Sequence, residues 1–527
     1  MGKLELYYNT IIHLRSGQVV HQCLNRLRKT VRRLLRKQYD FSLYRQGVAL
    51  QLDAPIDKYE SCSGDSFTFL NLTERFDGSW EYKHLGALWS FNINYMEYLL
   101  QPSMDVATGR QWIMRFISSQ ATNAIGLSPY CIALRSVNWI KFLTANRAAL
   151  TAEDIATIET SLYSQCRILQ DNLEYNLAGN HLLEDFFAML WGGIYFADEK
   201  MYRIAATNLV AQLKEQALAD GANFEQSPMY HCIILDRVLD AVNLLQGNAR
   251  FPDTKALCDQ LRHIASSMLG WLQTICYADG SFPLFNDSAE GIAPTSAMLF
   301  DYASRLGIEW RAATSDASGY YCIDGANYEL RMDMGGIAAS YIPGHSHADT
   351  FNFELRVAGR PFIVDSGIST YQWCERRQYE RSTAAHNTVT VNDENSSRVW
   401  AAFRCAQRAK VFDIKKDAAS ISATHDGYSK HGALHTRSFA WSDAGVAITD
   451  TLSGNVCGKA YLHFAPGVDV ALDGNRVVTP VAQIIFDNAL SVEMSDGEVA
   501  RKYNRLERNI VVSISFKGKL SSRIQLQ

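Results

Sequence analysis

The sequence predicts an α+β protein in which a helical domain, either a bundle or an α/α toroid, precedes an antiparallel β-sandwich. Apolar residues repeat every three to four positions from about residue 85 to 310, which is the period of amphipathic helices. After about residue 315 the period changes to two, which is the period of strands with one buried face. At 527 residues the chain is also too long for one ordinary core, so two or three domains are expected.

The composition is that of a globular protein, and it excludes several classes. Hydrophobic residues make up 47% and charged residues 20% of the chain, which argues against disorder, and a net charge of −4 provides no field that would favour nucleic acid. The 11 cysteines have no metal-type spacing, so reduced thiols are expected rather than disulfides. We find no secretory signal and no apolar run of roughly 20 residues, so we expect a cytoplasmic protein.

Residues 1–80 form a lead-in that contains a basic amphipathic segment. Between residues 13 and 38, Val20, Leu24, Leu27, Val31 and Leu34 fall at helical spacing. The same segment carries the cationic residues Arg15, Arg26, Arg28, Lys29, Arg32, Arg33, Arg36 and Lys37. One interpretation is peripheral contact with an anionic surface, either membrane headgroups or an acidic polymer. The other is a helix packed on the main body with its basic face in water.

Residues 81–312 are assigned to the helical domain. Glycines such as Gly179 and Gly221 separate its segments. The expected helices span residues 86–101, 107–118, 132–146, 151–172, 180–197, 199–218, 227–246, 254–276 and 294–306.

Residues 313–527 are assigned to the β-sandwich. Turn pairs such as Asp324-Gly325 separate short runs rich in β-branched and aromatic residues. The expected strands span residues 319–324, 327–332, 337–342, 351–357, 361–365, 387–392, 408–413, 419–424, 446–451, 459–464, 468–471, 476–479, 482–486, 489–494 and 509–516. A cleft where the two domains meet is the default location for a functional site.

Two histidines, His345 and His347, directly precede the alternating apolar residues Phe351, Phe353 and Leu355. If the pair lies on the strand or on its extended lead-in, both side chains point the same way. Such a pair can share a metal, or one histidine can bind a metal while the other transfers protons. The alternative is two histidines in a loop without a functional role.

Two helix starts carry further polar residues. His181 and Glu184 lie on one helix face, so Glu184 can orient the imidazole, while Asn180 can simply cap the helix. Tyr230 follows Pro228 at the next such start, where the helix dipole could lower the pKa of the phenol. The structural alternatives are a surface histidine and an aromatic residue that anchors its helix.

A metal site can be assembled from residues at three strand ends. Asp365 ends one apolar run and His386 begins another, and with His347 they form a donor set suited to Zn²⁺ with an open fourth position. The alternative is that all three are structural. The sequence contains no GxSxG, HExxH or Walker motif, and no carboxylate pair stands out as a glycosidase pair would.

These motifs resemble those of the heparinase II/III family of polysaccharide lyases. The resemblance runs from about residue 85 to 470. It rests on Asn-His-x-x-Glu at 180–184, Ser-Pro-x-Tyr-His at 227–231, Gly-His-x-His-Ala-Asp at 344–349, Val-Asp-Ser-Gly at 364–367, Ala-His-Asn-Thr-Val at 385–389, and the supporting stretches 134–141 and 279–288. It implies an incomplete α/α toroid followed by an antiparallel β-sandwich, and cleavage of a uronic-acid-containing polysaccharide by β-elimination.

The resemblance also implies roles for individual residues. Tyr230 and His345 would divide the acid and base steps, or Tyr230 would take both. Contact with the substrate is assigned to Asn180, His181, Glu184, Arg135 and Asn138. A structural Zn²⁺, held in some members, falls on His347, Asp365 and His386.

Relatives that lack a secretory signal resemble proteins of exopolysaccharide or capsule synthesis. That resemblance makes an acidic polysaccharide the expected partner. Two alternatives remain open: a uronate C5-epimerase, which returns the abstracted proton to the other face, and a non-catalytic glycan-binding or assembly protein.

Overall fold

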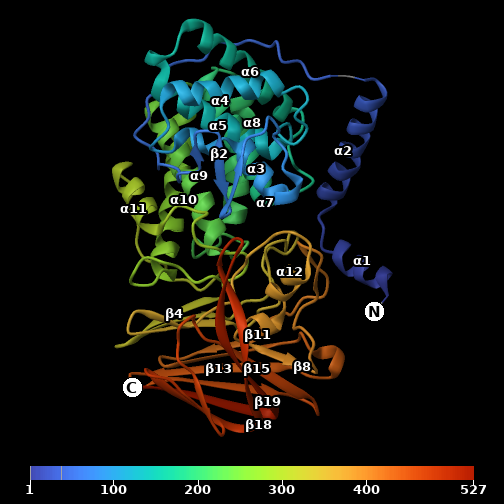
Figure 1. The fold of residues 1–527 in the computed structure, drawn as a ribbon, viewed down its shortest axis with the longest axis vertical. Helices are drawn as coiled ribbons and strands as arrows, with labels where there is room; N and C mark the ends of the chain where they lie inside the picture. Colours follow the sequence, from blue (N-terminus) through green and yellow to red (C-terminus); the bar gives the residue numbers. More distant parts are fainter. Residues whose placement is uncertain (1, 37) are drawn as a thin grey trace.

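The computed structural model describes residues 2–36 and 38–527, so Lys37 of the basic segment lies outside the described residues. An N-terminal pair of helices, α1 (Lys3–Ile11) and α2 (Ser16–Leu34), stands at the side of the molecule, a helical region lies above, and stacked sheets lie below (Figure 1). This order confirms the predicted fold class. The last helix of the helical region ends at Arg305 and the next strand begins at Tyr320. The predicted domain boundary at 312/313 falls between them and stays a prediction.

The helical region begins with a small sheet of β1 (Cys62–Ser63), β2 (Ser66–Phe69) and β3 (Leu72–Arg75). It continues with η1 (Lys83–Leu85), α3 (Ala87–Tyr95), η2 (Glu97–Leu100), α4 (Val106–Ser119), α5 (Pro129–Asn146), η3 (Arg147–Ala149), α6 (Ala152–Gln170), α7 (Gly179–Tyr195), α8 (Glu199–Gln216), α9 (Pro228–Gly247), α10 (Thr254–Ile275) and α11 (Ser296–Arg305). Helix α7 packs on α8, and α9 packs on α10. The expected helix 86–101 is interrupted at Met96, whose φ of 57° is left-handed.

The strand region contains β4 (Tyr320–Asp324), β5 (Tyr328–Asp333), β6 (Phe353–Val357), β7 (Arg360–Ile363), α12 (Glu375–Glu380), η4 (Thr383–Ala385), β8 (Val389–Val391), β9 (Val399–Trp400), β10 (Arg404–Cys405), β11 (Val411–Lys416), β12 (Ser420–His425), η5 (Ser429–His431), β13 (His435–Ser442), β14 (Gly445–Leu452), β15 (Cys457–His463), β16 (Ala471–Asp473), β17 (Arg476–Val478), β18 (Ala482–Lys502) and β19 (Arg505–Leu526). A four-stranded antiparallel sheet, β4-β5-β6-β7, faces a ten-stranded sheet. One apolar core joins them, with Phe353 and Leu355 from the first and Phe439 and Ile514 from the second.

Three expected strands differ from the structure. Residues 337–342 form an irregular loop because Ala339 and Tyr341 pack against Phe224 of the helical region instead of pairing with a strand. The runs 482–486 and 489–494 belong to the single strand β18, which has a register irregularity between Asp487 and Ala489.

The β18–β19 hairpin ties the two regions together. It rises from the large sheet toward the helices, as the red hairpin in Figure 1 shows. Near its tip the carbonyl of Tyr503 accepts a hydrogen bond from Asn71 Nδ2 at 2.8 Å, and the carbonyl of Arg501 accepts one from the backbone N–H of Glu290 at 2.8 Å. The ring of Tyr503 packs edge-on against that of Tyr371 with centroids 5.3 Å apart. The hairpin therefore braces the junction at which the candidate site lies.

A buried histidine in α9 makes the stability of the helical region depend on pH. Nδ1 of His231 accepts a hydrogen bond from the backbone N–H of Asn223 at 3.2 Å, and Nε2 donates to the carbonyl of Met268 at 3.1 Å. The contact at Nδ1 requires the neutral ring, because a protonated Nδ1 cannot accept a hydrogen bond, and burial lowers the pKa of His231 from 6.5 to about 3. Below pH 6.5 the unfolded chain therefore binds a proton that the folded chain excludes, so stability falls as the pH is lowered through this window.

We expect this histidine to account for roughly 1.4 kcal/mol of lost stability per pH unit between about pH 6 and 4. Melting temperatures of the parent and of His231→Asn, measured by circular dichroism at pH 7 and pH 5, check the effect. The variant is expected to melt lower at pH 7 and to lose less on acidification. An equal loss in both proteins would assign the acid sensitivity to other buried groups.

Candidate active site

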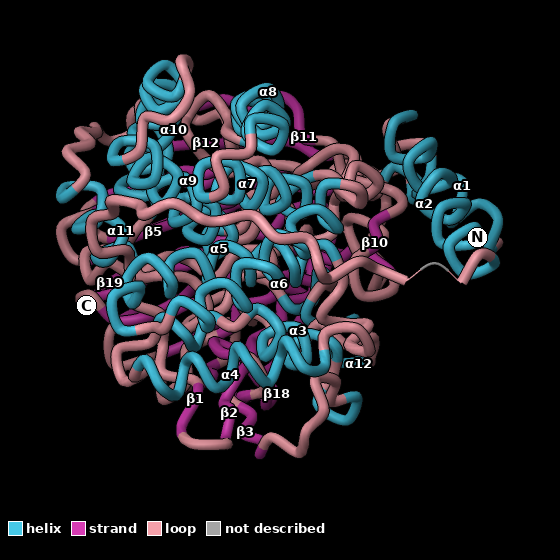
Figure 2. Tube along the Cα trace, turned by 90° about the horizontal axis from the view of Figure 1, so that it is seen from above, coloured by secondary structure: helices cyan, strands magenta, loops and turns pink. Residues whose placement is uncertain are grey.

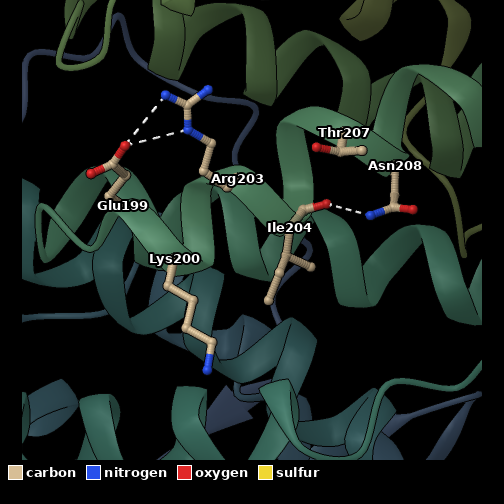
Figure 3. Close-up of a pocket in the computed structure, with 6 residues that line it drawn as sticks. All are labelled: Glu199, Lys200, Arg203, Ile204, Thr207 and Asn208. Atoms are coloured by element: carbon tan, nitrogen blue, oxygen red, sulfur yellow. Dashed lines mark hydrogen bonds and ion pairs between the residues drawn. The ribbon is translucent and has the colours of Figure 1, made fainter.

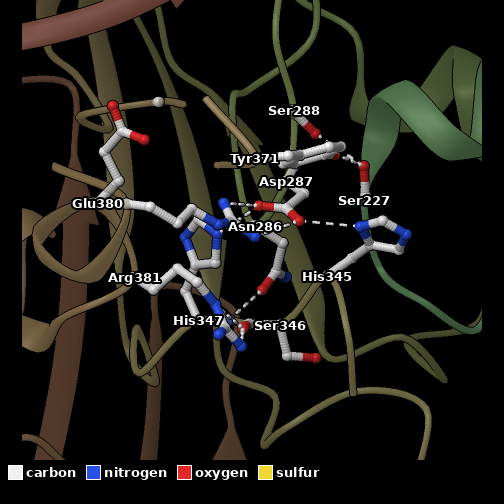
Figure 4. A network of polar contacts seen from close by, with 12 residues as sticks. Ser227, Asn286, Asp287, Ser288, His345, Ser346, His347, Tyr371, Glu380 and Arg381 are labelled. Carbon is white, nitrogen blue, oxygen red and sulfur yellow. Dashed lines mark hydrogen bonds and ion pairs between the residues drawn. The ribbon is translucent and has the colours of Figure 1, made fainter. Parts of the chain in front are cut away.

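Some of the predicted site residues lie together where the helical region contacts the four-stranded sheet. Tyr230 lies in the first turn of α9, Asn180 and His181 lie in the first turn of α7, and His345 lies in the loop before β6. Two other loops complete the site. Asp287 comes from the segment between α10 and α11, and Tyr371 comes from the segment before α12 (Figure 4).

Tyr230 is held by the cap of its helix. Ser227 Oγ accepts a hydrogen bond from the backbone N–H of Tyr230 at 3.2 Å, and Pro228 occupies the first helical position. The ring of Tyr230 lies 4.0 Å, centroid to centroid, from that of His345, and the phenol oxygen lies 3.2 Å from the hydroxyl of Tyr371. The two residues are 115 positions apart in the sequence, so only the family resemblance, and not their spacing, led us to expect them near one another. Their catalytic roles stay a prediction.

The pKa of Tyr230 is raised, whereas its position at a helix start led us to expect a lowered pKa. The phenol is therefore protonated at neutral pH. Burial raises the pKa of Tyr230 well above 10, and the nearby carboxylates of Asp287 and Glu225 add to the shift. Tyr371 opposes it, as a hydrogen-bonding neighbour, but is outweighed. The helix dipole is too small to offset the loss of water around a buried phenolate. Tyr230 is therefore arranged as a proton donor.

Asp287 is the centre of the polar network. It lies in the stretch 279–288 that supports the family resemblance, but no motif predicted a role for it. Its carboxylate accepts two hydrogen bonds from Arg377, at 2.5 and 2.7 Å, one from His345 Nδ1 at 2.9 Å, and one from His347 Nε2 at 2.8 Å (Figure 4). Burial alone would raise the pKa of Asp287, but Arg377 and the two histidines hold it well below its usual range. A charged Asp287 accepts from both rings, so it fixes the tautomer of His345 and of His347.

Glu225 connects the two helix starts with His345. One of its oxygens lies 3.4 Å from His345 Nε2, and the other accepts a hydrogen bond from the backbone N–H of Asn180 at 3.4 Å. Burial raises the pKa of Glu225. The structure therefore brings Asn180 to the same site as His345, through a carboxyl group whose role the sequence did not indicate.

His181 has a different acidic partner from the predicted one. Its Nδ1 pairs with Glu174 at 3.0 Å, and its ring lies against that of Tyr130 with centroids 4.5 Å apart. Glu184 points into the helical core instead, where Arg237 Nε donates to it at 3.0 Å. The spacing from His181 to Glu184 was compatible with a pair, but Glu184 lies on the buried side of α7 and His181 on the half-exposed side. Substrate contact by Glu184 stays a prediction.

Arg135 and Asn138 of α5 are almost completely buried, and their contacts are internal. The three guanidinium nitrogens of Arg135 donate to Gln165 and to the carbonyls of Asn94 and Gly126. Asn138 donates to the carbonyl of Tyr95 at 2.9 Å. These contacts hold α5 against the segments around α3, and the predicted contact of both residues with substrate stays a prediction.

A group of buried donor atoms close to Asp287 fits a metal ion. Ligand atoms of His347, Asp349 and His386 lie within 4.8 Å of one another. Within the described residues, Nδ1 of His347, Oδ2 of Asp349 and Nε2 of His386 make no hydrogen bond, although all three are buried. Buried polar atoms without partners are costly, and two imidazoles with one carboxylate are a set that Zn²⁺ accepts.

The structure adds Asp349 to the predicted set and gives Asp365 another contact. Oδ2 of Asp365 lies 2.9 Å from Nδ1 of His386, and it also accepts a hydrogen bond from Asn352. In this arrangement Asp365 orients His386 from behind, while the opposite nitrogen faces His347 and Asp349. Direct ligation by Asp365 stays a prediction.

Zinc content tests the composition of this group. After dialysis against buffered zinc, we expect His347→Ala and His386→Ala to lose the metal, measured by mass spectrometry, and His345→Ala to keep it. Asp349→Ala is expected to lose the metal, whereas Asp365→Asn is expected to bind it about 10–100-fold more weakly. The reverse order for the two aspartates would restore Asp365 as the ligand.

A depression elsewhere on the surface shares no residue with this site. It lies on α8 and is lined by Glu199, Lys200, Arg203, Ile204, Thr207 and Asn208 (Figure 3). Arg203 pairs with Glu199 one helical turn away, and no group of buried donors faces the depression among the residues drawn. It offers no chemistry comparable to that at the junction.

The chain is an α+β protein with a helical region, a β-sandwich and a His-Tyr site at their junction. Comparisons with known sequences identify its family. Residues 131–304 match the family described as heparinase II/III N-terminus, and residues 309–527 match that described as heparinase II/III-like, C-terminal. The chain belongs to the heparinase II/III family.

Individual relatives are distant. A heparin-sulfate lyase of Pedobacter heparinus is 25% identical over 336 residues, which are 55% of this chain and 49% of that protein. One of Bacteroides stercoris is 22% identical over 327 residues, or 55% of this chain and 46% of that protein. The chain thus spans about half the length of these relatives. A crystal structure of heparinase III matches with a TM-score of 0.65 and 18% identity, covering 86% of this chain and 80% of that one, and it confirms the fold.

Proposed function

We propose that this protein is a lyase that cleaves a uronic-acid-containing polysaccharide by β-elimination. The observation that carries the proposal is the contact between the protonated phenol of Tyr230 and the imidazole of His345, with ring centroids 4.0 Å apart. Elimination requires a base for the C5 proton and an acid for the leaving O4, and these side chains are suited to those two roles. Membership of the heparinase II/III family supports the same reaction type.

In the proposed reaction, Nε2 of His345 takes the C5 proton while Asp287 holds the Nδ1–H. The electron pair of the C5–H bond forms the C4–C5 double bond, the C4–O4 bond breaks, and the phenol of Tyr230 gives its proton to O4. Asn180 and His181 bind the substrate carboxylate and offset the charge that develops on it. Glu225 must move away from Nε2 of His345 when substrate binds. The 3.4 Å distance between Glu225 Oε2 and His345 Nε2 indicates a weak contact that substrate can displace.

Aromatic rings beside the acid–base pair provide a surface for a sugar ring. The ring of Tyr371 lies 5.1 Å from that of Phe403, and Phe403 lies 6.1 Å from His345, centroid to centroid. Phe403 is 40% exposed, so part of this surface is open to a ligand. A metal held by His347 and His386 would supply order to the loop that carries His345. A role in exopolysaccharide or capsule metabolism is a further part of the proposal, and it rests on the resemblance of the sequence alone.

Ultraviolet absorbance of the unsaturated product tests the proposal. Parent protein is incubated with a panel of uronate polymers that includes the acidic polysaccharide of the source organism, and products are identified by mass spectrometry. Absorbance that rises with the parent and not with Tyr230→Phe is the expected result. Solvent deuterium incorporated at C5 without absorbance would indicate the epimerase instead. If neither signal arises with any polymer, the protein is not a lyase and the non-catalytic alternative is favoured.

A further inference from the structure

The two N-terminal helices expose an apolar surface and bury a polar one. Helices α1 and α2 project from the side of the molecule in two perpendicular views (Figures 1 and 2). An amphipathic helix that packs on a water-soluble body normally turns its apolar face inward. The contacts of α2 show the opposite arrangement.

Polar side chains of α2 make its contacts with the helical region. Nε2 of Gln18 donates to the carbonyl of Leu177 at 3.3 Å, and Asn25 donates to Asn176 Oδ1 at 2.7 Å. Further contacts on this face are the ring of His21 stacked on Tyr175, a hydrogen bond from Asn176 Nδ2 to Gln22 Oε1 at 3.1 Å, and one from Arg28 to the carbonyl of Asp171. These residues recur at helical spacing, so one whole face of α2 is a polar contact face.

The apolar stripe of α2 is exposed along its length. Leu27 is 60% exposed and Leu34 is 74% exposed, and the remaining members are Val20, Leu24 and Val31. Helix α1 adds Leu4, Tyr7, Tyr8, Ile11 and its neighbour Ile12, all of which are more than half exposed. Many exposed large apolar side chains within one short segment are characteristic of a binding surface.

The charge of the same segment selects the partner. Between Leu6 and Tyr39 the chain has eight Lys or Arg residues and no Asp or Glu, although the whole protein has a net charge of −4. Arg26, Lys29 and Arg33 are exposed. A helix with basic residues on its polar side and an exposed apolar stripe on the other is complementary to the headgroup region of an anionic bilayer. A second copy of the segment would bring like charges together, and an acidic polysaccharide would leave the apolar stripe in water.

We propose that α1 and α2 bind the surface of an anionic lipid bilayer, with the apolar stripe at the boundary between headgroups and acyl chains. Within the described residues, no helix combines the length and the apolar run needed to span a membrane, so the contact is peripheral. This inference is independent of the proposed lyase activity.

The segment also contacts both regions of the protein beside the candidate site. Arg15 pairs with Glu215 of α8 at 2.6 Å, and its guanidinium lies 3.7 Å from the ring centroid of Tyr341, in the loop that carries His345. Helix α1 reaches the strand region, where Trp400 Nε1 donates to Thr10 Oγ1 at 3.1 Å. A bilayer bound by this segment would therefore lie on the side of the molecule next to the junction.

Sedimentation with lipid vesicles tests the proposal on the full chain. The parent is expected to bind vesicles of phosphatidylglycerol and phosphatidylcholine at least tenfold more tightly than vesicles of phosphatidylcholine alone, and to dissociate as salt is raised. A triple variant of the stripe, with Leu24, Leu27 and Val31 each changed to Ser, is expected to lose binding. Its matched control changes the exposed apolar residues Ile414, Leu472 and Leu490 to Ser, and it is expected to bind like the parent.

A second variant, with Arg26, Lys29 and Arg33 each changed to Gln, is expected to bind about 100-fold more weakly, from about fivefold per charge. Melting temperatures show that each variant is folded. Three outcomes would overturn the proposal. The first is equal vesicle binding by the stripe variant and its control. The second is a parent protein that binds no vesicles but forms a dimer, with the stripe variant monomeric, and the third is binding to a soluble acidic polysaccharide that only the charge variant loses.

Discussion

Tyr230→Phe is expected to lower kcat by about 10²–10⁴-fold on any polymer that the parent cleaves, with little change in folding. The variant keeps the ring that packs on His345 and removes only the hydroxyl that would protonate O4. Burial favours the protonated phenol, so the acid is already in its active form at neutral pH. Because the proton is needed only as the C4–O4 bond breaks, KM should change far less than kcat.

The neighbouring Tyr371 supplies a matched control for this experiment. Its phenol oxygen lies 3.2 Å from that of Tyr230, so Tyr371→Phe removes a hydrogen bond and leaves the proposed acid in place. We expect it to reduce kcat by less than about tenfold, from the net value of one hydrogen bond. Initial rates of product absorbance measure both. If Tyr371→Phe were inactive and Tyr230→Phe active, the acid would be Tyr371.

The helices and strands could be predicted from the sequence wherever their buried positions are filled by apolar residues. The helices from α4 to α11 begin and end close to their expected positions because Gly, Pro and Asn separate long periodic segments. Strand β13 was missed for the opposite reason. Its inward positions are filled by His435, Arg437 and Phe439, so two of three buried side chains are polar and the alternation is hidden.

The site could be predicted only where a motif names its residues. His345, Tyr230 and Asn180 belong to recognisable motifs, and the structure brings them together around Glu225. No motif predicted a role for the carboxylates that hold them. Glu174, Glu225 and Asp287 lie in turns or loops, where acidic residues are common for local reasons, and only the folded chain shows which imidazole each one contacts. The orientation of α2 could not be predicted from the sequence either, since the periodicity of a helix does not specify which face packs on the protein.

Asp287→Asn is expected to have the largest combined effect on stability and turnover. The amide cannot balance the charge of Arg377, which is completely buried, and removing one partner of such a pair costs about 3–5 kcal/mol. The same change replaces one acceptor oxygen, the partner of either His345 or His347, with a donor, so the tautomer of that ring is no longer fixed. We expect a lower melting temperature, and a kcat lowered by about 10²-fold or more in protein that is still folded.

Asp450 offers a control of the same composition outside the site. Its carboxylate accepts from Arg437 at 2.7 and 2.9 Å and from His435 at 2.7 Å, in the core of the large sheet. Asp450→Asn should therefore lower the melting temperature by a similar amount while kcat, measured at a temperature where both variants are folded, stays close to that of the parent. Equal losses of kcat in the two variants would mean that Asp287 acts only through stability. Each variant leaves a buried arginine without its counter-charge, Arg377 in Asp287→Asn and Arg437 in Asp450→Asn. A loss of kcat confined to Asp287→Asn would therefore come from the positioning of His345 and not from the unpaired arginine.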